Sequence, residues 1–96
     1  MLSHEIIAEK IKQVAAEFPV KRISYFGSYA NGSANENSDL DILVEFKEKA
    51  ISLFIIADMK YKLENAFGVT VDIIHAPLPK DSIIEIDKEV VVYDAA

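Results

Sequence analysis

The sequence predicts an α/β domain with a mixed central sheet of three strands plus a short edge strand, and with helices packed on one face. Two observations carry this prediction. Stretches with apolar residues at three- and four-residue spacing alternate along the chain with short runs rich in Val, Ile and Phe. The 96 residues, half of them apolar, make a single domain spanning residues 1–96 with a modest core.

Charge and composition narrow the function classes. A net charge of −6 and a single arginine argue against a nucleic-acid binder, because no basic patch outweighs the acidic residues. The absence of cysteine excludes disulfides and thiolate metal sites and fits a reducing compartment. No signal pattern and no run long enough to span a membrane is present, so we expect a cytoplasmic protein without membrane contact.

The first element expected is a helix over Ser3–Phe18, where apolar residues recur every three or four positions. Ser3 is the predicted N-cap. Pro19 should end the helix, because the residue before a proline avoids helical geometry. We interpret His4, in the first turn, as a solvated surface residue.

Arg22–Phe26 should form the first strand, after which Gly27 lets the backbone turn and approach a ligand without a Cβ. Ser28 is expected to cap a short helix through about Asn35. Free amide groups at such a helix start favour a phosphate, although an ordinary strand–turn–helix junction has the same residues. The residues up to Ser38 are rich in turn formers and predict a loop.

The second strand is expected at Leu40–Phe46. Alternation assigns one set of residues to the helix-covered face and another to the opposite face: Leu40, Ile42 and Val44 against Asp39, Asp41, Leu43 and Glu45. Asp39 and Asp41 should lie about 6.5–7 Å apart at their Cα atoms. Such a pair suits one or two divalent metals, although a solvated strand start is the alternative. Glu45 is interpreted as accessory or solvated.

A long helix is expected over Ile51–Phe67, ended by Gly68 in a left-handed conformation. Its predicted core stripe consists of Leu53, Ile56, Met59, Leu63 and Phe67. Ile51, Phe54 and Ile55 widen this stripe. We interpret them as buried core, with an apolar patch for a partner as the alternative.

The third strand is expected at Val69–His75. A lone carboxylate within this apolar run, Asp72, must be solvated, paired or bound to metal. His75 should face the opposite side and is interpreted as structural. A short helix over Asp81–Asp87 and an edge strand over Val90–Tyr93 complete the chain.

Three segments in this order resemble the signature of the minimal nucleotidyltransferases, small members of the DNA polymerase β superfamily. The first is Phe26-Gly27-Ser28, and the second, after ten intervening residues, is Asp39-Leu40-Asp41. The third is Val71-Asp72-Ile73, where the family has its third acidic residue. The resemblance covers nearly the whole chain and implies the nucleotidyltransferase fold.

The resemblance also implies a site. Asp39, Asp41 and Asp72 become the catalytic, metal-binding carboxylates, with Asp72 as the candidate general base, and Gly27, Ser28 and Ser38 become the nucleotide-binding residues. The implied cofactor is Mg²⁺, two ions with the nucleotide. The implied reaction transfers AMP from ATP to an acceptor hydroxyl.

Family knowledge implies a partner as well. Such domains are commonly encoded beside a HEPN-domain protein, a helical RNase toxin, and some act as antitoxins by transferring AMP to a tyrosine of that toxin. A homodimer is also left open. The family often has Arg at the positions of Tyr29 and Asn31, and an Arg grips phosphate as neither of these does. Two alternatives therefore remain: an inactive module that neutralises or regulates a helical partner, and a regulatory subunit that binds ATP without turnover.

Overall fold

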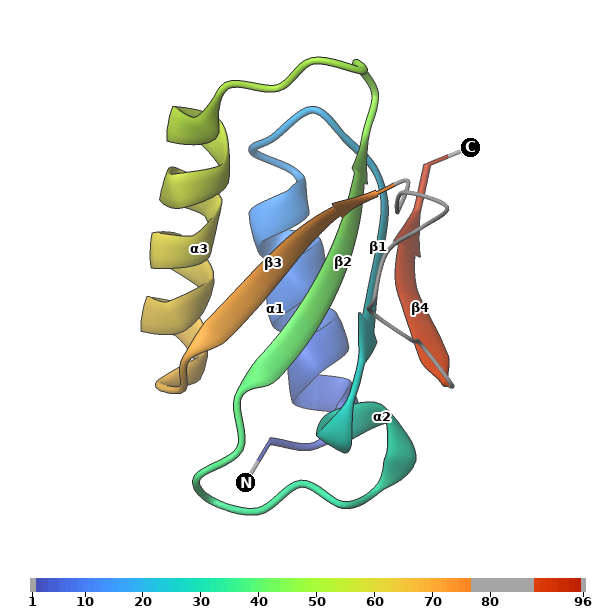
Figure 1. The fold of residues 1–96 in the computed structure, drawn as a ribbon, viewed down its shortest axis with the longest axis vertical. Coiled ribbons are helices and arrows are strands. Elements are labelled where there is room, and N and C mark those ends of the chain that lie inside the picture. Colours follow the sequence, from blue (N-terminus) through green and yellow to red (C-terminus); the bar gives the residue numbers. More distant parts are fainter. Residues whose placement is uncertain (1, 77–87, 96) are drawn as a thin grey trace, which may run out of the picture.

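The computed structural model describes residues 2–76 and 88–95. Figure 1 shows a four-stranded sheet with α1 and α3 next to each other on one side and the short α2 at one end. The elements in chain order are α1 (His4–Ala15), β1 (Val20–Phe26), α2 (Ser28–Asn31), β2 (Leu40–Phe46), α3 (Leu53–Phe67), β3 (Val71–Ala76) and β4 (Glu89–Asp94). The predicted mixed α/β class is confirmed, and the edge strand is β4.

The strands lie in the order β3-β2-β1-β4. β1 runs antiparallel to both β2 and β4, whereas β2 and β3 are parallel. A parallel neighbour needs a crossover connection, and α3 provides it. The register of the parallel pair sets Leu40 beside Val71 and, one residue further, Asp41 beside Asp72.

The core lies between the sheet and the two long helices. Leu40, Ile42 and Val44 are fully buried, as the alternation along β2 predicts. They belong to one cluster with buried residues of α1 and α3: Ile7, Ile11, Val14, Ala15, Met59, Leu63 and Phe67. Because every second side chain of β2 packs against the helices, the side chains between them point to the opposite face of the sheet.

The opposite face is not uniformly open. Ser24, Phe26 and Leu43 are buried there, at 0, 8 and 9 % exposure, although they point away from the core cluster. Asp72 and Asp39 are exposed. This face is therefore closed at these three residues and open at Asp39 and Asp72.

The structure confirms the predicted N-cap of α1 and the predicted C-terminal glycine of α3. The Ser3 hydroxyl accepts a hydrogen bond from Ile6 N at 3.3 Å, and Gly68 ends α3 with φ 72°. The other ends differ from prediction. α1 stops at Ala15 because the next residues form tight turns, with Phe18 N donating to Ala15 O. α3 starts two residues late, because the Ser52 hydroxyl caps it by accepting from Phe54 N.

Other predicted boundaries also shift, and β4 is one residue longer at each end than the predicted edge strand. α2 ends at Asn31, not Asn35, because Gly32 adopts a left-handed conformation with φ 83°. β1 starts at Val20 and β3 at Val71. The helix expected over residues 81–87 lies outside the described residues.

His4 is exposed, as predicted, but its ring also has a partner. Its Nδ1 lies 2.7 Å from the hydroxyl of Tyr25, a buried residue of β1, and the two ring centroids are 5.9 Å apart. The side chain therefore ties the start of α1 to the strand that ends at Gly27.

The interpretation of the α3 start as core is wrong for two residues. Leu53 and Phe54 are 79 and 87 % exposed, whereas Ile51 and Ile55 are partly buried against the core. Since Ser52 caps the helix just before them, the first turn projects beyond the packed layer.

Within residues 2–76 and 88–95, no helix is long and apolar enough to cross a membrane.

Candidate active site

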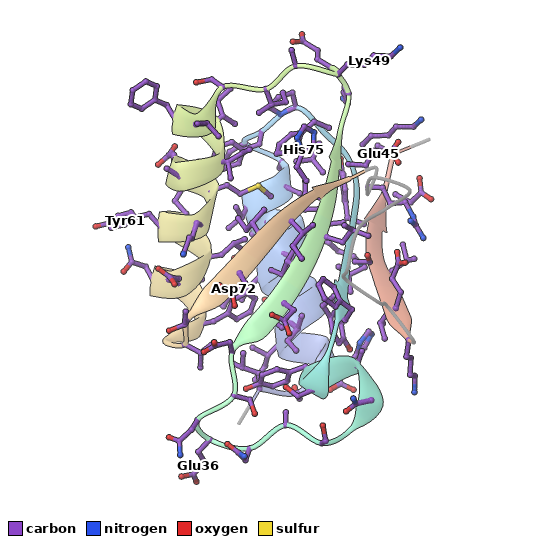
Figure 2. The ribbon with its side chains drawn as sticks, viewed as in Figure 1. Glu36, Glu45, Lys49, Tyr61, Asp72 and His75 are labelled. Atoms are coloured by element: carbon purple, nitrogen blue, oxygen red, sulfur yellow. The ribbon has the colours of Figure 1, made fainter. Side chains whose placement is uncertain are left out.

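Asp41 and Asp72 are direct neighbours across the parallel strand pair. Each is the second residue of its strand, and the register pairs them. Adjacent strands lie about 4.8 Å apart, and paired residues of a parallel ladder share a face. Both carboxylates therefore leave the sheet on the side away from α1 and α3. Figure 2 shows Asp72 on β3, towards the end of the sheet where that strand begins.

The electrostatics of Asp41 indicate that all three predicted carboxylates gather. Partial burial raises the pKa of Asp41 above its usual value, and the negative charges of Asp72 and Asp39 raise it further. Like charges held this close favour a proton or a cation between them. The structure thus pairs Asp41 with Asp72, and the charge of Asp39 acts on Asp41, while the shared metal-binding role of the three carboxylates stays a prediction.

Gly27 lies directly behind this cluster. A Cβ at residue 27 would collide with Oδ2 of Asp41. The backbone also has φ 71° and ψ −147°, a conformation that is open almost only to glycine. Close packing and backbone geometry therefore both require glycine at the end of β1.

Ser28 does not have the predicted role of helix cap. Gly27 occupies the N-cap position, and no side chain makes a capping hydrogen bond. The carbonyl of Gly27 accepts from Ala30 N and Asn31 N, each at 3.0 Å. With four residues, α2 is too short for a substantial helix dipole. A phosphate here would depend on individual backbone amides and the Ser28 hydroxyl.

Short-range hydrogen bonds shape the loop between α2 and β2. The Asn31 side chain accepts from Ser33 N at 2.9 Å, and Asn35 Oδ1 accepts from Asn37 N at 2.8 Å. The Ser38 hydroxyl accepts from Asn35 N at 2.8 Å, one residue before Asp39. Ser38 thus closes the loop, and its contact with a nucleotide stays a prediction.

The chain's one arginine lies away from the carboxylates. Arg22 pairs with Glu45 in the β1–β2 register, four residues beyond Asp41, and its Nη1 lies 3.0 Å from Glu89 Oε1. Glu45 itself is 3.3 Å from Lys21 Nζ, so the accessory metal role is not supported. No arginine is therefore present at the carboxylate end of β2 to bind a phosphate group.

The donor set fits a hard divalent cation that arrives with its substrate. No group of three or more His, Cys, Asp or Glu residues in the described part of the chain is arranged to hold a metal by itself. Mg²⁺ typically uses one or two carboxylates, substrate phosphate oxygens and water, and does not need a complete protein cage. Asp41 with either neighbouring carboxylate offers that set.

Two contacts, one directly after β1 and one within it, could not be predicted from sequence motifs. The close packing of Gly27 on Asp41 becomes visible only when β1 and β2 are paired. The bond between His4 and Tyr25 joins residues 21 positions apart, and no local pattern predicts it.

Sequence comparisons agree with the geometry. A family model described as a nucleotidyltransferase domain matches residues 7–94. A Methanocaldococcus jannaschii protein named as a protein adenylyltransferase is 46 % identical over 83 residues, covering 81 % of this chain and 87 % of the relative. The protein adenylyltransferase MntA of Thermococcus cleftensis is 36 % identical over 88 residues, covering 92 and 88 %.

Structural comparisons give the same fold. A toxin–antitoxin crystal structure with AMP-PNP aligns with a TM-score of 0.77 at 21 % identity, covering 91 % of this chain and 73 % of that chain. A protein described as a minimal nucleotidyltransferase aligns with a TM-score of 0.63 at 39 % identity, covering 74 and 71 %.

Proposed function

Since this chain belongs to the nucleotidyltransferase domain family, we propose that it transfers AMP from ATP to a hydroxyl of a partner protein, with Mg²⁺ as cofactor. The observation that carries the proposal is the side-by-side placement of Asp41 and Asp72, with Asp39 close enough to raise the pKa of Asp41. We assign the proposed reaction to the cytoplasm, where ATP is available.

The residues have distinct tasks in this reaction. Asp41 and Asp39 hold the cation, and Gly27 keeps the Asp41 carboxylate at the end of β1. Mg²⁺, when bound, neutralises charge on the triphosphate and on the attacking and leaving oxygens. Backbone amides at Gly27 and Ser28 receive phosphate oxygens.

Asp72 is the proposed general base, because it is exposed beside Asp41 and can face an incoming acceptor. The acceptor oxygen bonds to the α-phosphorus as the bond from that phosphorus to the bridging oxygen of pyrophosphate breaks. The acceptor proton passes to Asp72. Positioning and charge neutralisation suffice for such a transfer, which lies within reach of a small domain.

We place the acceptor on a helical toxin, as a tyrosine hydroxyl of a HEPN-type partner. Support comes from relatives named protein adenylyltransferases and from a toxin–antitoxin complex with the same fold. The domain itself would then act as the antitoxin.

The experiment is label transfer from α-labelled ATP to the co-expressed partner. Asp41→Asn should lower transfer by at least about a hundredfold, because a charge-stabilising group of the transition state is lost. Glu36→Gln is the matched control, since it removes one exposed carboxylate from the loop next to the site. Equal transfer by the wild type and Asp41→Asn, or equal loss in both variants, would refute the proposal.

A second function is favoured by the exposed start of α3. Leu53 and Phe54 present apolar side chains to solvent, and the single arginine is engaged elsewhere. A module that binds a helical partner without chemistry would need only such a surface. Partner neutralisation that persists without ATP and in Asp41→Asn would support this reading, while its loss in Leu53→Ser/Phe54→Ser would locate the contact.

A further inference from the structure

A second hollow lies at the end of the sheet opposite the carboxylates. It has a volume of about 620 Å³ and is bounded by the end of β2, the following connector, the start of β1 and the end of β3. Figure 2 shows His75, Glu45 and Lys49 at this end of the sheet, and Asp72 well away from them. Glu45 lies four positions after Asp41 on the extended strand, a span of roughly 13 Å. The hollow is therefore separate from the proposed active site.

The charge of the hollow differs from that of the whole chain. Its lining has three lysines, Lys21, Lys47 and Lys49, against two glutamates, in a protein of net charge −6. Lys21 is engaged with Glu45 at 3.3 Å. In the described part of the chain, neither Lys47 nor Lys49 forms an ion pair. Among residues 2–76 and 88–95, these two ammonium groups on one connector therefore have no carboxylate partner, and each can pair with an anion.

Two aromatic rings form the apolar part of the lining. The His75 ring meets Phe46 edge to face, with centroids 5.2 Å apart and an interplanar angle of 81°. Phe46 is buried, so it holds the partly exposed imidazole in place. An apolar or aromatic group of a ligand can pack against the partly exposed His75 ring. Pockets for small molecules commonly have volumes of about 300–1,000 Å³ and such a mixture of apolar walls and few charges.

We propose that this hollow, whose lining includes Lys47, Lys49 and the partly exposed His75 ring, binds a small phosphorylated molecule with an aromatic body. The phosphate meets the lysines and the aromatic body packs on the His75 ring. A phosphate dianion matches two lysine charges better than a single carboxylate does. The site is independent of the carboxylate end and does not require the proposed transfer reaction.

Amide NMR of the ¹⁵N-labelled full chain tests the proposal, with phenyl phosphate as the probe in the absence of Mg²⁺. Saturable shifts are expected at Lys47, Lys49 and His75. Lys47→Gln/Lys49→Gln should weaken binding by about fivefold or more, since two exposed charge contacts are lost. Lys10→Gln/Lys60→Gln, which removes the same charge outside the hollow, should leave binding unchanged.

Phenol, which has the ring without the phosphate, should cause no saturable shift at these three residues. The proposal is overturned if phenyl phosphate shifts only residues 27–41 or no residue. It is also overturned if phenol binds equally well, or if both double variants weaken binding alike, which would show only long-range charge attraction. Far-UV circular dichroism of each variant confirms that the fold is intact.

Discussion

Gly27 lies so close to Asp41 that a methyl group on residue 27 would overlap the Asp41 carboxylate. The turn after β1 thus packs directly against the Asp41 side chain of β2. The glycine of the motif therefore fixes the position of a side chain as well as turning the backbone.

Gly27→Ala should disable the site and destabilise the fold. The backbone conformation costs a non-glycine residue about 1–3 kcal/mol, and the added methyl group must displace the Asp41 carboxylate. Urea unfolding and label transfer measure the two effects. Gly32→Ala is the matched control, because Gly32 also has positive φ but no atom within 4 Å of its would-be Cβ. It should lower stability by about 1–2 kcal/mol and leave transfer nearly intact. Equal transfer by both variants would contradict the steric argument.

Asp41→Asn should make the metal-free protein more stable while lowering transfer by at least about a hundredfold. The charged carboxylate is disfavoured by burial and by two acidic neighbours. Removing a like-charge strand pair is expected to stabilise by about 0.5 kcal/mol. Thermal unfolding without metal measures this gain. Asp39→Asn should give a smaller gain, since Asp39 is the weakest of the three causes. A destabilised Asp41→Asn would show that its carboxylate has a structural partner.

The stability of the metal-free protein should fall as pH rises through the titration of Asp41. The folded-state pKa of this acid is raised, so between its unfolded and folded pKa values the folded chain binds more protons. The contribution is favourable below this window and lost above it.

Added Mg²⁺ should have the opposite pH dependence. It binds the ionised carboxylates, so its stabilising effect should grow over the same rise in pH and disappear in acid. Unfolding midpoints with and without Mg²⁺, from acidic to neutral pH, measure both trends. Mg²⁺ stabilisation that is unchanged in Asp41→Asn would place the ion elsewhere.

The His4–Tyr25 hydrogen bond should contribute measurably to stability. His4→Ala leaves the buried Tyr25 hydroxyl without this partner, at a cost of about 1–3 kcal/mol. Tyr25→Phe should cost less, because it removes the hydroxyl as well. A double-mutant cycle by urea unfolding measures their coupling. Zero coupling energy would show that the contact adds nothing.

Replacing Phe54 by serine should change stability by less than about 0.5 kcal/mol, because the side chain is 87 % exposed. Met59→Ala, one and a half turns later on α3, should cost about 2–5 kcal/mol because Met59 is fully buried. Urea unfolding of the two variants compares them. A large loss in Phe54→Ser would restore the original interpretation of this residue as core.

Much of the fold was predictable because the sheet is strongly patterned. The bounds of β2 were predicted correctly, since alternation and the flanking polar residues agree there. The helix ends were less predictable. Pro19 restricts only the residue before it, and apolar spacing continues through the turns after Ala15, so periodicity overestimates α1. The predicted burial of Leu53 was wrong, because the spacing of apolar residues along a helix does not show where the contact between that helix and the sheet ends.

The site was predictable in part. Strand geometry alone puts Asp39 and Asp41 on one side, but the pairing of Asp41 with Asp72 depends on how two distant strands align. The family resemblance supplied that link, and the comparisons confirm the family. The individual roles of Gly27, Ser28, Ser38 and the three aspartates stay predictions for the variants above.

Parallel pairing of β2 and β3 has a consequence for how activity arises. The two paired acids are 31 positions apart, and the whole of α3 must cross over before the second joins the first. Such non-local pairing forms slowly compared with helices and hairpins. A nascent or partly folded chain therefore lacks the paired carboxylates, and the proposed transfer requires the completed crossover.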